Sequence, residues 1–501
     1  MFRYFREVMC SMWLLYAVLF FSAFFTPASV EAISNPAAAY CRFLGYEYEI
    51  VDDPSGNQYG ICNFPDRSKA SAWDFLRGKA GKRFSYCARK GYGTETRRVE
   101  TEGVITEFAV CVELDNTKKS ARKETPLVEF MEMNGDPLYD LKPLKVVQDA
   151  NDDLLPEKSS SLTGRSLVTA FDWRNKDGHA YIGAVRDQGS CGACYAFGAA
   201  AAAEGTYNVA ADKYDSQCVD FSESFIAWCL GKYGPYSTHF SGCDGADYDY
   251  QELEALTNEG ITTESNFPYT ATDPGSCTHW SDPVEIFTSW GRIPSNDVET
   301  IKNALLTYGV LDVAVMVTSG FNSYSGGIFH DTLTTCPDGA YTATNHAVAL
   351  VGWGNDPAYG DYWILRNSWG SSWGEGGYMR IAVRSARVAC AATYLKYGTY
   401  PEYGVTYDGN GNTGGTPPED HGAYSTADAV TVLDNSGKLV KTGYTFSGWN
   451  TAPDGSGTSY SPADVFRMGR ADVTLYARWS INRSAGSILL YLPSVFKACQ
   501  P

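Results

Sequence analysis

The placing of the cysteines constrains this chain more than any other feature of its sequence. The chain holds 14 cysteines, and one of them, Cys10, lies within the first 32 residues. Of the other 13, four precede residue 112, eight lie between residues 191 and 390, and Cys499 stands near the end. Cysteines pair in oxidising compartments, and an odd number leaves at least one sulfur outside an internal bridge. We therefore expect disulfide-stapled parts and one free, reactive thiol.

Residues 1–32 have the pattern of a signal peptide. Arg3 and Arg6 give a positive start, residues 13–25 form a nearly unbroken apolar run, and residues 30–32 offer small side chains before a cut. The apolar run is shorter than the roughly 20 residues that cross a bilayer. A retained N-terminal anchor is the alternative. We expect a secreted, extracellular protein with no transmembrane segment after signal removal, and association with the cell surface stays open.

Length and charge limit the remaining possibilities. A chain of 501 residues is too long for one core, so about three or four domains are expected. The formal net charge of −18 argues against a nucleic-acid partner, because nucleic-acid binding needs a basic face.

Residues 33–114 contain a weak repeat of two small units, each with one cysteine near either end. Bridges Cys41–Cys62 and Cys87–Cys111 would staple units too small to hold a good core. The first unit resembles a small bacterial domain that carries a haemolysin label. Members of that family usually have two more cysteines, near the positions of Ala70 and Ala80 here.

The composition then changes three times along the chain. Residues 115–166 are polar and mixed, which is typical of a linker or a pro-segment. Residues 167–398 begin with an alanine-rich helix pattern and continue with alternating apolar strands, so they predict an α+β domain with two lobes. Residues 481–501 form a tail with a short apolar run.

Residues 402–480 are rich in Gly, Thr, Ser and Tyr and predict β-strands with tight turns. The stretch resembles the Listeria–Bacteroides repeat of microbial surface proteins, in which Gly443-Tyr444, Gly448-Trp449 and Trp479 would be fold positions. Two roles stay open for these aromatic residues, a core and a ligand surface. The second role would imply a cell surface or another protein as the partner.

The segment Q-G-S-C-G-A-C-Y-A-F, residues 188–197, carries the clearest chemistry. Cys194 stands where the alanine-rich helix begins, and the positive end of a helix lowers the pKa of a thiol. Cys191 precedes the helix and lacks that help, so Cys194 is the favoured reactive sulfur. A redox pair would need a thioredoxin-like βαβ context, and a zinc site would need a second C-x-x-C of suitable spacing. We therefore expect neither a metal nor a cofactor.

A reactive thiol needs a base, a group that orients the base, and donors for the oxyanion. His346 leads into an apolar strand and is the candidate base, and the amide of Asn367 could orient its ring. Trp369 could cover that hydrogen bond from water. Gln188 lies six residues before Cys194 and could donate its amide to an oxyanion.

Three segments together resemble the signatures of the papain/cathepsin cysteine proteases. They are Q-G-S-C-G-A-C-Y-A-F, N-H-A-V-A-L-V-G-W-G and N-S-W-G-S-S-W-G-E-G-G-Y-M-R-I. The resemblance covers residues 167–398 and implies a papain-like two-lobed fold. It also implies these site residues: Cys194 as nucleophile, His346 as base and acid, Asn367 as orienter, Gln188 in the oxyanion hole, Gly245 and Ala347 along the substrate cleft, and Trp369 as shield.

The sequence departs from the family pattern in two places and has no visible helical pro-segment. Tyr195 replaces the usual tryptophan after the nucleophile, and Ala246 stands where a second glycine is common. The family pattern also implies three bridges, Cys191–Cys243, Cys229–Cys277 and Cys336–Cys390. Cys218 and Cys499 remain unassigned, as free thiols, as a pair or as a link to another chain.

The expected protein is thus a multidomain, secreted cysteine endopeptidase that acts on proteins or peptides through a covalent acyl-enzyme. Endopeptidase is preferred because no insertion that would block one end of the cleft is visible in the sequence, and an exopeptidase of the same family is the first alternative. A catalytically inactive surface-binding or adhesion protein on the same fold is the second.

Overall fold

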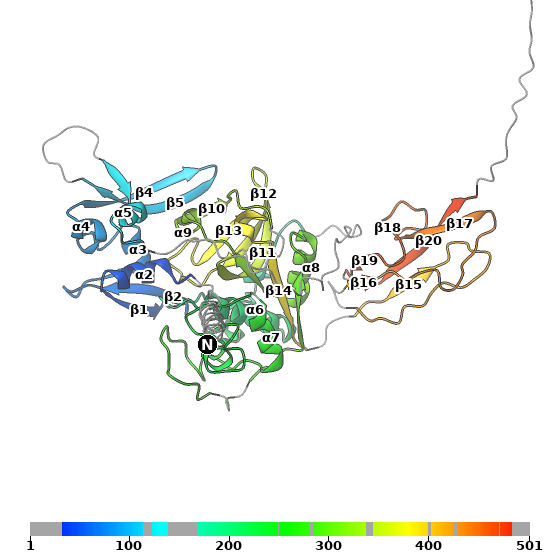
Figure 1. The fold of residues 1–501 in the computed structure, drawn as a ribbon, viewed down its shortest axis with the longest axis horizontal. Coiled ribbons are helices and arrows are strands. Elements are labelled where there is room, and N and C mark those ends of the chain that lie inside the picture. Colours follow the sequence, from blue (N-terminus) through cyan, green and yellow to red (C-terminus); the bar gives the residue numbers. More distant parts are fainter. Residues whose placement is uncertain are drawn as a thin grey trace, which may run out of the picture. The chain divides into compact units, whose positions relative to one another are not determined.

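The computed structural model divides into two compact units, one up to residue 398 and the other from residue 402 (Figure 1). It describes residues 33–113, 123–138, 168–398 except 249, 280–281, 283 and 337–343, and 402–482 except 425–428 and 470. The expected signal peptide, the tail beyond residue 482, Cys10 and Cys499 lie outside the described residues. Among the described residues, no helix has both the length and the apolar character to cross a membrane.

The helical lobe of unit 1 is built around α6, Cys194–Ala210, which begins at the cysteine chosen from the sequence. Alanine has the highest helix propensity, and its small side chain lets neighbours approach α6 from several directions. A π-helix over Phe225–Lys232 and α7, Gln251–Asn258, belong to the same lobe. Their apolar side chains and those of α6 form one core cluster that includes Phe225, Trp228 and Leu253.

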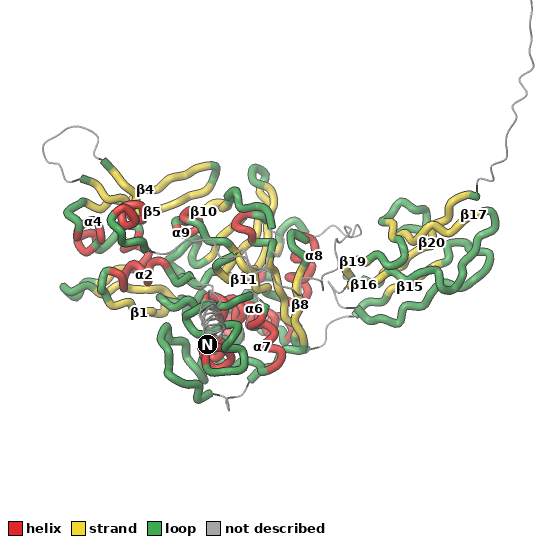
Figure 2. The backbone as a smooth tube through the Cα atoms, viewed as in Figure 1, coloured by secondary structure: helices red, strands yellow, loops and turns green. Residues whose placement is uncertain are grey.

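The second lobe is built on a large sheet, whose strands are yellow in Figure 2. The main path of the sheet runs β4-β5-β10-β13-β12-β11-β9-β14-β8, with β6 beside β5 and β7 beside β11. Strand β11 is buried along nearly its whole length, which matches its apolar sequence. The strands are β4 Gly93–Thr101, β5 Val104–Val112, β6 Glu124–Pro126, β7 Phe171–Asp172, β8 Ser289–Ile293, β9 Leu311–Val315, β10 Tyr324–Phe329, β11 His346–Asp356, β12 Gly360–Arg366, β13 Tyr378–Ala382 and β14 Ala391–Lys396.

Shorter helices complete unit 1. The α-helices are α2 Pro36–Phe43, α3 Ala72–Leu76, α4 Tyr86–Arg89, α5 Leu127–Met133, α8 Val298–Tyr308 and α9 Ser319–Asn322. The 3-10 helices are Lys82–Phe84, Trp173–Asn175, Asp215–Gln217 and Ser385–Arg387.

Residues 33–113 and 123–138, here called the N-terminal region, pack against the two lobes instead of standing apart from them. A small sheet of β1 Glu47–Asp52, β2 Gln58–Asn63 and β3 Lys69–Ser71 lies beside α2 and α3. The hairpin β4–β5 joins the large sheet, because β5 pairs antiparallel with β10. The N-terminal region and the second lobe therefore share one sheet.

Part of the stretch expected to be linker or pro-segment is folded. Strand β6 pairs with β5, and α5 follows it directly. The apolar residues Leu127, Phe130 and Met131 are buried at helical spacing, which explains why this polar-looking stretch packs. Residues 123–138 are therefore folded, and the role of residues 115–166 as a linker or a pro-segment stays a prediction.

Unit 2 is β-rich, as expected. Its strands are β15 Val405–Asp408, β16 Ala429–Thr431, β17 Tyr444–Asn450, β18 Ser459–Tyr460, β19 Val465–Arg467 and β20 Val473–Ile481. Trp449 is fully buried in the core of this unit, and Trp479 packs partly buried against the same core. Tyr444, by contrast, is 39% exposed. The core interpretation therefore fits both tryptophans and does not fit Tyr444.

Ten cysteines of unit 1 form the five disulfides that the sequence suggested. These are Cys41–Cys62, Cys87–Cys111, Cys191–Cys243, Cys229–Cys277 and Cys336–Cys390. Cys194 is free and buried, and Cys218 is free and partly exposed.

Candidate active site

The thiol of Cys194 lies at the first residue of α6 and is almost completely buried, with 3% of the residue exposed. The backbone N–H groups of Ala347 and Tyr195 hydrogen-bond to its sulfur. These contacts lower the pKa of the thiol, but burial outweighs them and raises it to about 12. Burial thus acts against the lowering expected from the helix start, because a thiolate is poorly solvated inside the protein.

His346 is the first residue of β11, and a single hydrogen bond and one aromatic contact hold its ring. The ring Nε2 lies 2.8 Å from Oδ1 of Asn367. The ring also stacks on Trp369, with centroids 4.7 Å apart and planes inclined by 27°. Burial lowers the pKa of His346 to about 4, although the hydrogen bond to Asn367 acts in the opposite direction.

The other ring nitrogen, Nδ1, is buried and has no hydrogen-bond partner among the described residues. A neutral imidazole that donates from Nε2 to the amide oxygen of Asn367 carries its lone pair on Nδ1. That nitrogen is therefore free to accept a proton. Burial acts on both groups in the direction of the uncharged forms, a neutral thiol and a neutral imidazole.

Gln188 is fully buried, and hydrogen bonds fix its side-chain oxygen, its side-chain nitrogen and its backbone carbonyl. Its Oε1 accepts a hydrogen bond of 2.7 Å from Oγ of Ser368, and its backbone carbonyl accepts one of 2.9 Å from the hydroxyl of Tyr269. Its Nε2 donates to two carbonyl oxygens, that of Cys191 at 2.9 Å and that of Ile33 at 3.0 Å. The second acceptor belongs to the N-terminal region.

The two residues expected to line the substrate cleft are Ala347, in β11, and Gly245, in a turn. Ala347 follows His346 in β11 and is 7% exposed. Gly245 is buried, and its φ of +94° suits a glycine in the turn after Cys243. The disulfide between Cys243 and Cys191 ties that turn to the segment just before Cys194.

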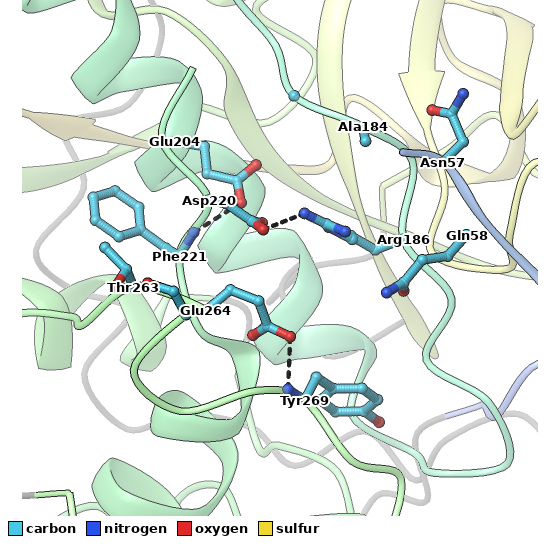
Figure 3. Close-up of polar contacts among 12 residues, drawn as sticks. Asn57, Gln58, Ala184, Arg186, Glu204, Asp220, Phe221, Thr263, Glu264 and Tyr269 are labelled. Carbon is cyan, nitrogen blue, oxygen red and sulfur yellow. Dashed lines mark hydrogen bonds and ion pairs between the residues drawn. The ribbon is translucent and has the colours of Figure 1, made fainter. Parts of the chain in front are cut away.

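Sequence reasoning missed a network of charged side chains, of which Figure 3 shows Glu204, Asp220, Arg186 and Glu264. Glu204, on α6, accepts a hydrogen bond of 3.1 Å from Arg366, at the end of β12, and one of 3.2 Å from the backbone N–H of Phe221. Arg186 pairs with Asp220 in the same network. One sequence signal could have indicated this network: Glu204 is a single glutamate within an otherwise apolar, alanine-rich helix.

This network connects the two elements that carry the candidate catalytic groups. Arg366 immediately precedes Asn367, and Glu204 lies on the helix that begins with Cys194. Burial raises the pKa of Glu204, with Arg366 opposing the shift. Burial also raises the pKa of nearby Glu264 to about 7. The buried ion pair of Glu204 with Arg366 therefore ties α6 to the residue that precedes Asn367.

Within the described residues, no group of three or more His, Cys, Asp or Glu side chains could hold a metal ion. The site consists of a thiol at a helix start, an imidazole fixed by an amide, and a side-chain amide donor. On a two-lobed α+β fold, this set is that of a cysteine-protease domain. The chain belongs to the papain family: the profile described as "Papain family cysteine protease" matches residues 167–398.

Curated relatives share this part of the chain. A cysteine proteinase COT44 of Brassica napus is 33% identical, over 50% of this chain and 72% of its own length. A cathepsin L-like peptidase of Aedes aegypti is 34% identical, over 46% of this chain and 63% of its own length. The chain thus spans less than two thirds of the length of several of these relatives. The solved digestive procathepsin L 3 of Tenebrio molitor is 31% identical, with a TM-score of 0.40, over 48% of this chain and 73% of that one.

Two further profiles match outside the protease domain. Residues 32–79 match a domain of unknown function, DUF333, and residues 403–478 match the Listeria-Bacteroides repeat domain. Both matches agree with the resemblances noted in the sequence.

Proposed function

We propose that this protein is a secreted cysteine endopeptidase in which Cys194 is the nucleophile and His346 the base and acid. The observation that carries the proposal is the state of His346, whose Nε2 is engaged by Asn367 while Nδ1 is left without a partner among the described residues. A ring fixed in this way has one nitrogen available for the thiol proton. The five disulfides support export, since such bridges persist in oxidising compartments.

The reaction would follow the two-step course of a thiol nucleophile. His346 takes the proton of Cys194, and the sulfur attacks a peptide carbonyl to give a tetrahedral oxyanion. The amide of Gln188 and the backbone N–H of Cys194 would stabilise that oxyanion. His346 then gives its proton to the leaving amine, which leaves a thioester. Water hydrolyses the thioester and regenerates the thiol.

Within this proposal, Trp369 and Asn367 are positioning residues. The stacked indole of Trp369 covers one face of the imidazole and keeps water from the Nε2 hydrogen bond. The uncharged Asn367 orients the ring without adding a negative charge beside it. Gly245 and Ala347 would line the substrate cleft, and proteins or peptides are the proposed substrates.

The test is a thiol-reactive peptidyl epoxide, followed by mapping of the adduct. We expect the label on Cys194 and not on Cys218, the other free thiol of the described residues. Hydrolysis is then measured on a peptide blocked at both ends, which an endopeptidase cuts and an exopeptidase does not. The proposal would be contradicted if Cys194 stayed unlabelled in a folded protein whose active site the reagent can reach.

Replacing His346 with alanine should lower kcat/KM by at least about 10³-fold, because the thiol then has no base. Asn367→Ala should cost less, about 10- to 100-fold, because the base remains and only its orientation is lost. The measurement is kcat/KM on the blocked peptide, with the thiol titrated to count intact sites. A greater loss for Asn367→Ala than for His346→Ala would contradict the assigned roles.

We propose that unit 2 is an accessory module that contacts a cell surface or another protein. Its support is its resemblance to a repeat domain, its own core around Trp449, and the exposed ring of Tyr444.

A further inference from the structure

A cavity of about 290 Å³ lies in unit 1, and none of the candidate catalytic residues lines it. The N-terminal region supplies most of its wall, from α3, β5 and the junction of β6 with α5, and α9 supplies the rest (Figure 1). Pro126 and Ser319 line the cavity and are exposed, so it opens to solvent. Its volume is close to the lower end of the range for small-molecule sites.

Apolar side chains form most of the wall of this cavity, here called the α3–α9 cavity. The indole of Trp73 is buried, and its N–H donates to the carbonyl of Trp369 at 2.9 Å, which fixes the ring. The apolar lining consists largely of Trp73, Leu76, Phe108, Ala109, Leu127 and Val128. A ligand with an apolar body would lose water-exposed surface here, which favours binding.

The wall also contains a buried cation. Arg77 is 5% exposed. Its guanidinium donates to the carbonyl of Ser372 at 3.1 Å and to that of Tyr324 at 3.2 Å, and its Nε has no hydrogen-bond partner among the described residues. A guanidinium stays charged in proteins, and buried charges are normally paired. Arg77 therefore has unused capacity for an anion.

The nearby carboxylates do not take up this capacity. Burial lowers the pKa of Arg77, and the charges of Glu107 and Asp74 oppose the shift. Glu107 lines the cavity, but it pairs with Lys79 at 2.5 Å and with Arg98 at 3.3 Å. In the part of the chain that the structure describes, neither carboxylate forms an ion pair with Arg77.

A second polar side chain of the wall lacks partners. Asn322 of α9 is 4% exposed, and its Oδ1 and Nδ2 have no hydrogen-bond partner within the described ranges. It stands two residues before Tyr324, whose carbonyl binds Arg77, so the two polar groups belong to the same part of the wall. Buried polar groups without partners cost free energy, and a ligand that supplies their partners would remove this cost.

We propose that the α3–α9 cavity binds a small organic carboxylate with an apolar body, such as a medium-chain fatty acid. The carboxylate oxygens would accept hydrogen bonds from Nε of Arg77 and Nδ2 of Asn322, and the apolar chain would pack against Trp73 and Leu127. Hydrogen bonds between charged groups are stronger than those between neutral groups, so an acid is favoured over an alcohol of the same length.

This binding site is independent of the proposed peptidase chemistry. The ligand would contact both the N-terminal region and α9, which belongs to the protease domain. A ligand that binds only the folded state stabilises it, so octanoate should also raise the urea midpoint of unfolding of unit 1.

The test is isothermal titration calorimetry with octanoate and with 1-octanol, which share a chain length and differ in the charge of the head group. The full-length secreted protein carries Cys194→Ala, which prevents self-digestion. It is compared with the same protein carrying Arg77→Met or Arg83→Met. Arg83 is the matched control, because it lies in the same region, pairs with Asp66, and has a side chain that is 69% exposed and outside the cavity wall.

We expect octanoate to bind at least about tenfold more tightly than octanol, because only octanoate pairs with the buried cation. Arg77→Met should weaken octanoate at least about tenfold and change octanol less than about twofold. Arg83→Met should leave both affinities unchanged.

Val128→Trp is a second variant, which keeps Arg77 and fills the cavity from a half-buried position of the wall. Binding of both ligands should be lost in this protein, and circular dichroism checks the fold of each variant.

Three results would overturn the inference. The first is an octanoate affinity no greater than that of octanol, which would leave Arg77 without a role in binding. The second is tight octanoate binding that survives both Arg77→Met and Val128→Trp, which would place the ligand elsewhere. The third is an absence of octanoate binding to the protein with an unchanged cavity wall. The comparison of octanoate with octanol on that protein decides the question even if neither wall variant folds.

Discussion

Cys194→Ala is expected to lower peptide hydrolysis by at least about 10⁴-fold while leaving the protein folded, because removal of a nucleophile eliminates the covalent step. The fold should tolerate the change, since α6 is rich in alanine and the other cysteines keep their bridges. The measurement is kcat/KM on the blocked peptide. Circular dichroism checks the fold.

Cys218→Ala is the control. Cys218 is partly exposed, and its sulfur contacts only the carbonyl of Ala180 at 3.4 Å among the hydrogen bonds of the described residues. Its loss should change kcat/KM less than about twofold. Hydrolysis near the normal rate in Cys194→Ala, or a collapse of activity in Cys218→Ala, would place the reactive sulfur elsewhere.

The second large effect is on stability. Arg366→Met should destabilise unit 1 by roughly 3–5 kcal/mol at pH 7, because it leaves the buried carboxylate of Glu204 without its cation. The two side chains are 6% and 2% exposed and lie 3.1 Å apart. Arg366 also donates to the carbonyls of Gly183 and Ala184, at 3.3 and 3.2 Å, so two backbone acceptors lose a partner. The measurement is the urea midpoint of unfolding in the Cys194→Ala background, which prevents self-digestion.

This destabilisation should shrink in acid. Burial already raises the pKa of Glu204 above its usual value, with Asp220 acting in the same direction and Arg366 and Arg186 opposing it. Without Arg366 the pKa rises further. A carboxyl with a raised pKa binds its proton more tightly in the folded state, so the variant should recover stability as the pH falls from 7 toward the unfolded value.

Arg380→Met is the matched control for this change. Its ion pair with Glu375 spans 2.6 Å, but the two side chains are 37% and 29% exposed. An exposed pair contributes about 0–1 kcal/mol, so this variant should lose little stability and show little dependence on pH. Equal losses for the two variants would mean that burial does not decide the energy of the Arg366 pair.

The candidate site could be predicted because its residues stand in short segments with local signals. Cys194 was chosen by the helix that follows it, and His346 and Asn367 by their places at the start of β11 and after β12. The structure brings His346, Asn367 and Trp369 together. The expected chemistry of Cys194 was incomplete, because the sequence cannot reveal how deeply the thiol is buried, and burial raises its pKa.

The docking of the N-terminal region was not predictable by the same means. Asn35 and Asp187 are 152 residues apart, and Trp73 and Trp369 are 296 apart. No periodicity or turn signal connects such positions, and the polar residues 123–138 hid a short helix with three buried apolar side chains. The ion pair of Glu204 with Arg366, which are 162 residues apart, was not predicted for the same reason. Contacts between these distant residues were therefore not predicted from the sequence, whereas features with a local sequence pattern were.

The pairing of β5 with β10 has a consequence for biogenesis. The strand Val104–Val112 is synthesised more than 200 residues before its partner Tyr324–Phe329, and contacts this far apart in sequence slow folding. Until they meet, β10 is an open sheet edge of the kind that recruits other chains. A protease domain expressed without residues 33–138 would therefore keep that edge exposed and aggregate during refolding. The hairpin β4–β5 is synthesised first, so it would be available to pair with β10 and to prevent β10 from associating with other chains.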